Sequence, residues 1–260
     1  DARRYYLYEA FYQRPGLNAI NIIDPDADSA SALAITQAAN KNFETLGTNY
    51  TTALTTFSAT QAGITMTTAT ADQDQAILLP HLDTNQTAWS GTKWGTENQV
   101  EWECSISLPA LDNQKVWAGL KLTNDQLVAT DANQMFFKYQ TDATNSEAFT
   151  DFTKWHFVYS VANTDYISQL PITVAADTQY HFKIEVDSDR KAAIFVNGIQ
   201  YNVTTTSGST GGTAVTTGTT KTGALTNDVD LIPYIGIENG AAAAEVLNVH
   251  YQAISRNVFE

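Results

Sequence analysis

The clearest hydrophobic pattern in the chain lies at residues 178–203. Apolar residues occupy every second position from Tyr180 to Val186, which predicts a strand with one buried and one solvated face. A second apolar run follows at 193–196. Asn197-Gly198 then gives a strong hairpin signal, because both residue types tolerate positive φ angles, and a third strand is expected at 199–203. The region is therefore predicted to form three antiparallel strands.

Short β-type patterns separated by turn residues continue through most of the chain after residue 50. Together they predict an all-β fold, a two-sheet antiparallel jelly-roll sandwich. The expected strands are 54–58, 64–68, 75–79, 99–108, 115–122, 134–139, 155–161, 179–186, 191–196, 199–203, 231–238 and 246–259.

The N-terminal part follows a different pattern. One short helix is predicted over residues 26–46, because apolar residues recur there at helical spacing and Gly47 is placed to end it. We therefore divide the chain into an N-terminal arm and helix at 1–47 and a sandwich at 48–260. The apolar positions that carry the helical pattern are Ile35, Ala38, Ala39, Phe43 and Leu46.

The arm that precedes this helix is dense in tyrosine and arginine, which are favoured at protein interfaces. Two interpretations stay open, in which the arm docks on a neighbouring subunit or covers its own sandwich, and we favour docking. The candidate partner-binding residues are Arg3, Arg4, Tyr5, Tyr6, Tyr8, Phe11, Tyr12 and Arg14.

Residues 204–224 form a Thr- and Gly-rich insert without any apolar period. Such a segment cannot bury a core of its own. It is expected to be either a mobile loop or a flap that orders on a neighbour, and the mobile loop is the favoured interpretation.

Charge and cysteine content narrow the function classes. The formal net charge of −14 argues against nucleic acid as a partner, because phosphate repels such a surface. No apolar run approaches the roughly 20 residues of a membrane-spanning helix, so no membrane partner is expected. Cys104 is the only cysteine and lies on the apolar side of its strand, which predicts a buried, unreactive thiol.

Reactive side chains do not converge in the sequence. The four histidines are scattered without metal-ligand spacing, and no nucleotide or nucleophile motif is present, so we expect no catalytic residue, no metal and no cofactor. Loop carboxylates such as Asp125 and Asp228 have the oxygen ligands that calcium prefers, but ordinary Asx turns explain them better. Glu101 and Glu103 share one face of a strand whose other face is apolar, which favours a simply solvated strand.

One loop carries a candidate carbohydrate site. Trp89 and Trp94 lie in a Gly-punctuated stretch, where exposed indoles would stack on sugar rings while Asp83 and Asn85 bond hydroxyl groups. In the alternative, which we favour, this loop folds over the edge of the sandwich and buries both indoles.

Three segments together, 117–125, 187–198 and 231–238, resemble the concanavalin A-like, laminin-G-like jelly roll over roughly residues 50–260. Some enzymes with this fold are glycoside hydrolases that carry acidic residues at alternate positions of one strand. Their motif has a further acidic residue where this chain has Trp102 or Ser105, so the resemblance implies no hydrolase here.

The aromatic arm, the Ala-rich helix and the acidic, Thr-rich sandwich are together similar to virion structural proteins of tailed marine phages. This resemblance implies a non-enzymatic capsid decoration or fibre protein on the virion surface, bound to the major capsid protein or other virion subunits, with homo-oligomers also expected. The alternative is a carbohydrate-binding, lectin-like module, and a hydrolase using Glu101 and Glu103 is the third hypothesis.

Overall fold

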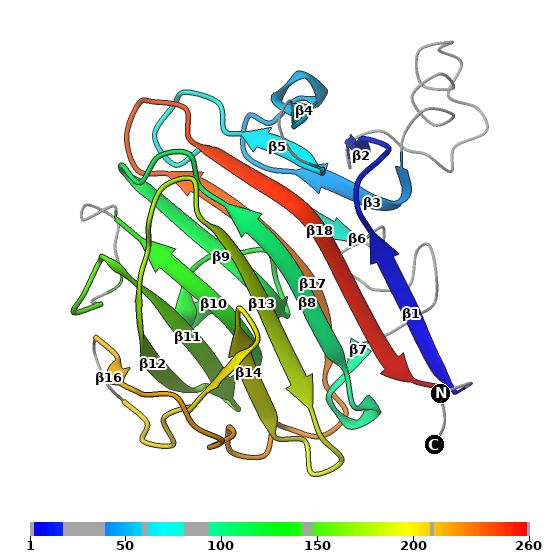
Figure 1. Cartoon of the computed structure of the whole chain (residues 1–260), viewed down its shortest axis with the longest axis vertical. Helices are drawn as coiled ribbons and strands as arrows, with labels where there is room; N and C mark the ends of the chain where they lie inside the picture. Colours follow the sequence, from blue (N-terminus) through cyan, green and yellow to red (C-terminus); the bar gives the residue numbers. More distant parts are fainter. Residues whose placement is uncertain are drawn as a thin grey trace.

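The computed structural model of the chain describes residues 3–17, 40–58, 62–80, 94–141, 147, 149–208 and 211–258. These residues form two β-sheets packed face to face, which confirms the predicted all-β sandwich (Figure 1). The helical turns in this part of the chain are the short 3₁₀ segments η1 (Thr52–Leu54), η2 (Thr96–Asn98) and η3 (Val128–Thr130). No helix among the described residues is long and apolar enough to cross a bilayer.

The first sheet, sheet A, has β8 and β18 at its centre. Its strands, in order across the sheet, are β15 (Ile199–Tyr201), β14 (Ala192–Val196), β13 (Gln179–Val186), β8 (Glu101–Ser107), β18 (Val246–Asn257), β5 (Ile64–Thr67) and β4 (Thr55–Phe57). Strand β1 (Arg4–Glu9) also pairs with β18, alongside the C-terminal half of that strand. Strand β18 is long enough to hold both β5 and β1 on one side.

The second sheet, sheet B, is broader. Its strands, in order, are β16 (Thr213–Ala214), β12 (Thr164–Thr173), β11 (Lys154–Val161), β10 (Gln134–Gln140), β9 (Gln114–Lys121), β17 (Asp230–Asn239), β6 (Gln75–Pro80), β3 (Asn40–Leu46) and β2 (Pro15–Leu17). The two-residue strand β7 (Trp94–Gly95) pairs with the start of β17. Sheet A and sheet B thus each combine elements from distant parts of the chain.

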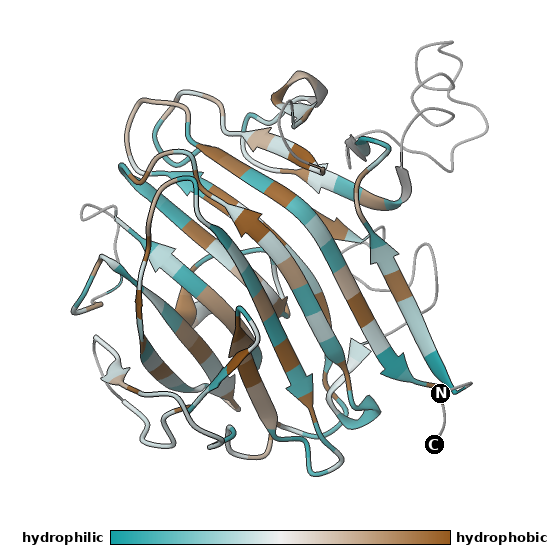
Figure 2. Ribbon diagram, viewed as in Figure 1, coloured by the Kyte–Doolittle hydropathy of each residue, from teal (hydrophilic) through white to brown (hydrophobic). Residues whose placement is uncertain are grey.

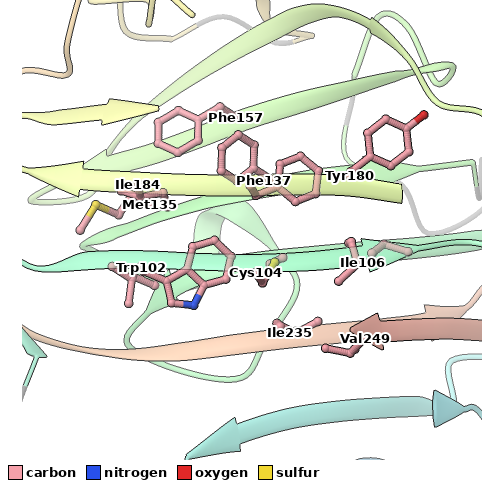
Figure 3. Packing of buried hydrophobic residues seen from close by; sticks show 14 of the residues in the cluster. Trp102, Cys104, Ile106, Met135, Phe137, Phe157, Tyr180, Ile184, Ile235 and Val249 are labelled. Atoms are coloured by element: carbon pink, nitrogen blue, oxygen red, sulfur yellow. The ribbon is translucent and has the colours of Figure 1, made fainter. Parts of the chain in front are cut away.

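The core lies between the inner faces of the two sheets. Trp102 and Cys104 of sheet A and Phe137 of sheet B are fully buried there (Figure 3). The strand alternation that the sequence predicts is visible as bands of polar and apolar residues along β8, β13 and β18 (Figure 2). Asn197 and Gly198 both have positive φ, at 51° and 79°, which confirms the predicted hairpin turn.

The N-terminal prediction is wrong in two respects. Residues 4–9 of the arm cover their own sandwich, which is the interpretation that we did not favour, because β1 is an antiparallel strand of sheet A, with Arg4 opposite Asn257 and Glu9 opposite Gln252. The predicted helix fails at its C-terminal end, where residues 40–46 form strand β3 and pair with β6. Cross-strand pairing of Phe43 with Pro80 here overrides the helical spacing of the apolar residues. The rest of the predicted helix, residues 26–39, lies outside the described residues.

The Thr- and Gly-rich insert is also not the mobile loop that we expected, over the part that is described. Ala192 N–H donates to Thr222 Oγ1 at 2.8 Å, and Thr222 N–H donates to the Ala192 carbonyl at 3.0 Å. Lys221 forms an ion pair with Asp187 at 2.8 Å. These contacts to the sandwich satisfy the polar backbone of a segment that has no core of its own.

Candidate functional site

The outer face of sheet A, which points away from the core, carries a group of solvent-exposed polar and aromatic side chains. The alternation of β8 buries Trp102 and Cys104 and turns Glu101 and Glu103 outward. In β13, Lys183 lies directly opposite Glu103. The sequence pattern predicted this outward placement of the two glutamates. We call this surface the open face.

Strand β1 adds tyrosines to the open face. Tyr6 lies opposite Ser255, and Tyr8 lies opposite Ala253, so each tyrosine ends a row that crosses β18 to reach a β8 glutamate. The exposed fractions of Tyr6 and Tyr8 are 61% and 62%. Small residues in β18 therefore separate two exposed aromatic rings from a charged row.

A depression of about 270 Å³ lies between these two groups. Short side chains form its floor, the tyrosines form one wall, and charged side chains form the other. Its lining consists of Tyr6, Leu7, Tyr8, Glu101, Glu103, Lys183, Ala253, Ile254 and Ser255. A concave surface with flat aromatic and charged walls is suited to a polar ligand that also has apolar patches.

Charges on the open face form a connected group. Arg4 forms an ion pair with Glu101 at 3.1 Å, and Lys183 lies 4.0 Å from the other oxygen of Glu101. Lys183 also pairs with Glu185 at 2.5 Å. Partial burial lowers the pKa of Lys183, but the hydrogen bond to Glu185 and the surrounding carboxylates outweigh it, and the net pKa is raised. The protonated, positively charged form of Lys183 is therefore stabilised beside the depression.

Tyr251 extends the aromatic wall toward the centre of the sheet. Its ring centroid lies 6.0 Å from that of Tyr8 and 6.1 Å from that of His181. Burial, and then the charge of Glu103, raises the pKa of Tyr251. Strict alternation from Val246 would turn Tyr251 inward, and the register shift between Val249 and Tyr251 turns it outward instead, so the sequence pattern did not predict its place on the open face.

Arg4 explains why β1 stays on its own sandwich. Its guanidinium donates to Ser255 Oγ at 2.8 Å, to Asn257 Oδ1 at 3.0 Å and to the Gln99 carbonyl at 2.9 Å. Together with the ion pair to Glu101, these charge-assisted bonds satisfy the guanidinium within the chain. Arg4 is therefore a structural anchor of β1.

The other predicted arm residues separate into buried and exposed groups. Phe11 is 1% exposed and packs edge-on against Phe43, with ring centroids 5.4 Å apart. Arg14 donates to the Thr55 carbonyl at 3.2 Å, and the Arg3 carbonyl accepts from Val258 N–H. Tyr12 is 82% exposed and does not line the depression. Whether these residues contact a partner stays a prediction.

Of the two tryptophans in the predicted carbohydrate site, Trp94 lies among the described residues, and its position does not support the site. Trp94 is 1% exposed, and its ring packs 5.8 Å from that of Tyr5, so it offers no face to a sugar. Pairing of β7 with β17 places the indole inside the sandwich. Trp89, Asp83 and Asn85 lie outside the described residues.

The outer face of sheet B is the second place where a ligand could be expected, but loops cover it. Trp117, Phe136 and Tyr234 point away from sheet A, yet each is 0% exposed. Val128 and Phe149 from the connecting loops pack onto them. We call this surface the covered face.

Three buried lysines tie these loops and strands together on the covered face. Burial lowers the pKa of Lys138 to about 8, although the Glu147 carboxylate acts in the opposite direction. Burial likewise lowers the pKa of Lys121 despite the charge of Asp131. The ion pairs are Lys115–Glu238 at 2.5 Å, Lys121–Asp131 at 3.1 Å and Lys138–Glu147 at 2.5 Å.

Potential metal ligands are dispersed over the part of the chain that the structure describes. No cluster of three or more His, Cys, Asp or Glu side chains with metal-binding geometry occurs there. The thiol of Cys104 is fully buried, and burial raises its pKa, as predicted for an unreactive cysteine.

Comparisons with known proteins place the fold. No family model and no curated protein matches the sequence. A protein of unknown function from Shewanella oneidensis MR-1 superposes with a TM-score of 0.55 at 9% identity, covering 99% of this chain and 89% of the other. A glycosyl hydrolase family 16 protein from Mycobacterium smegmatis has a TM-score of 0.52 at 10% identity, covering 95% and 98%.

A β-1,3-glucanase from Mycobacterium marinum is similar too, with a TM-score of 0.50 at 10% identity and coverage of 95% and 97%. The chain therefore has the concanavalin A-like sandwich fold that family 16 glycoside hydrolases also have. At these identities the likeness establishes the fold alone.

Proposed function

We propose that this protein binds carbohydrate, without hydrolysing it, in the depression on the open face. The observation that carries the proposal is the pair of exposed tyrosines, Tyr6 and Tyr8, facing Glu103 and Lys183 across a floor of small residues. A tyrosine ring has a flat apolar face for the C–H side of a sugar and a hydroxyl for its polar rim. Carboxylates and an ammonium group complete the set of acceptors and donors that sugar hydroxyls need.

The arrangement of Glu101 favours binding over hydrolysis. Glycoside hydrolysis by two carboxyls requires one of them to donate a proton. One oxygen of Glu101 pairs with Arg4 and the other lies 4.0 Å from Lys183, and both contacts need the carboxylate form. Glu185, which lies opposite Glu101, pairs with Lys183 at 2.5 Å, so both carboxyls that neighbour Glu103 on the open face are engaged by a cation.

Binding to a β-1,3-glucan oligosaccharide tests the proposal, with a glycan array to widen the search. This probe is chosen because the fold is shared with a β-1,3-glucanase. We expect Tyr6→Ala and Tyr8→Ala each to weaken binding about tenfold, equivalent to ~1.4 kcal/mol, measured by titration calorimetry. Tyr12→Ala is the matched control, because Tyr12 is exposed but does not line the depression, and it should bind as the wild type does.

Two results would reject the proposal. One is the absence of any glycan ligand on the array, and the other is binding that Tyr6→Ala and Tyr8→Ala leave unchanged. Turnover of the glucan that Glu103→Gln abolishes would instead favour the hydrolase. The role on a virion surface, with a capsid subunit as partner, has no support in the comparisons and stays a prediction from the sequence.

A further inference from the structure

Strand β1 has an edge that faces no other described strand. It pairs with β18 on one side, and in the part of the chain that the structure describes no strand pairs with its other side (Figure 1). Val258 N–H donates to the Arg3 carbonyl, which makes residues 3 and 258 a hydrogen-bonded pair. In an antiparallel ladder such pairs alternate. The backbone groups of residues 5, 7 and 9 therefore face β18, and those of Arg4, Tyr6 and Tyr8 face outward.

The other described edge strands are short or protected, and β4 and β16 have only three and two residues. Edge β2 is three residues long and begins with Pro15, and edge β15 has a bridge from Tyr201 to Thr217 beside it. Strand β1 has six residues with no proline, glycine or lysine. Natural proteins use short strands, prolines and lysines to prevent edge pairing. A six-residue edge without these features is suited to pair with another strand.

We propose that β1 pairs antiparallel with β1 of a second copy of this chain, about a two-fold axis at Tyr6, so that sheet A continues across the dimer. In such a ladder, a residue whose backbone N–H and C=O groups face outward must lie opposite another residue of the same kind. With the axis at Tyr6, all three meet: Tyr6 lies opposite Tyr6 of the partner subunit, and Arg4 lies opposite Tyr8 of the partner subunit.

Charge complementarity selects the same register and the same occupant. With the axis at Tyr6, Arg3 lies opposite Glu9 of the partner subunit at both ends of the ladder. Opposite charges in directly opposed positions stabilise a strand pair. If the register shifts by two residues, both Arg3–Glu9 pairs are lost. In each copy, one of the three outward-facing residues then lies opposite no residue of the partner's strand. A two-fold axis also makes the interface self-complementary, which is the usual form of a homodimer.

Tyr6 offers a matched pair of variants that separates backbone pairing from side-chain contact. Tyr6→Pro removes the ring and the outward N–H, whereas Tyr6→Ala removes the ring alone. The bonds to β18 are kept in both, because the Tyr6 N–H faces away from β18, and proline is tolerated at such edge positions. Sedimentation equilibrium of the full chain measures the dimer dissociation constant. We expect a wild-type dimer, a change of no more than tenfold in Tyr6→Ala, and a loss of at least 100-fold in Tyr6→Pro.

A second measurement tests the register and does not depend on the folding of the proline variant. In the proposed dimer, a cysteine at position 6 faces its own copy, whereas one at position 8 faces position 4. Tyr6→Cys should therefore form an intermolecular disulfide under mild oxidation, and Tyr8→Cys should not. The native Cys104 is buried and does not interfere. A monomeric wild type, an unchanged Tyr6→Pro dimer, or equal cross-linking by both cysteines would overturn the proposal.

Discussion

The outer faces of the two sheets differ, although both belong to strands that pack on the same core. On the covered face of sheet B, Trp117 and Phe136 are fully buried under loop residues such as Phe149. On the open face of sheet A, Tyr6 and Tyr8 stay more than half exposed beside a depression. Alternation along a strand thus shows which side meets the other sheet. It does not show whether the opposite side meets water.

Charged side chains also have different roles on the two faces, because one face is buried and the other is exposed to water. The ion pair Lys121–Asp131 is almost fully buried, so each charge depends on its partner. The ion pair Lys183–Glu185 is about one third exposed, and water compensates when either partner is lost. Buried pairs hold the loops of the covered face in place, and exposed pairs leave the open face available to a ligand.

The largest expected effect comes from removing one charge on the covered face. Asp131→Asn leaves the Lys121 ammonium buried without a counter-charge, and we expect a loss of about 3–5 kcal/mol in the free energy of unfolding. Urea denaturation measures it. Asp151→Asn is the control, because Asp151 pairs with Lys154 in an ion pair about 30% exposed, and its cost should stay below about 1 kcal/mol. Equal costs for the two variants would contradict the contrast between buried and exposed pairs.

The covered face should also make the fold sensitive to acid. His156 stacks on Phe149 with ring centroids 4.3 Å apart, and burial lowers the pKa of His156 to about 4 from its ordinary 6.5. Between these values the unfolded chain binds a proton that the folded chain does not, so stability is lost as the pH falls from 6.5 to 4. The expected loss is about 3 kcal/mol.

His156→Phe keeps the stacked ring and removes the titration. Its unfolding free energy should therefore fall less than that of the wild type over the same pH range, as measured by urea denaturation at each pH. Parallel pH profiles for the two proteins would show that His156 is not the group responsible.

Local pattern predicted the fold better than it predicted the site. The hairpin at Asn197-Gly198 and the outward direction of Glu101 and Glu103 depend on residues near one another in sequence, and both predictions are confirmed. The depression depends on Tyr6 meeting Ser255, about 250 positions away, and no local pattern contains that pairing. The failure at 40–46 has the same origin, because pairing with β6 decided the conformation there.

Tyrosines of the N-terminal strand should have unequal effects on stability. Tyr5 is 37% exposed and packs on the buried Trp94, whereas Tyr12 is 82% exposed. Tyr5→Ala removes partly buried aromatic area and should cost about 1–2 kcal/mol in the free energy of unfolding. Tyr12→Ala should change it by less than about 0.5 kcal/mol. Equal values would mean that β1 is not held against the core in solution.

The smallest change in stability, and the sharpest test of the open face, comes from Lys183→Met. The pKa of Lys183 is raised, so its ion pairs contribute below the ordinary lysine pKa and are lost as the pH rises above it. Because these pairs are exposed to water, their removal at pH 7 should cost less than about 1 kcal/mol in the free energy of unfolding. Binding of the β-1,3-glucan oligosaccharide should nevertheless weaken severalfold, because the ammonium group lines the depression. A variant that loses stability but keeps full binding would show that Lys183 has a structural role, like the buried lysines of the covered face. The proposal that charges on the open face serve ligand binding would then be wrong.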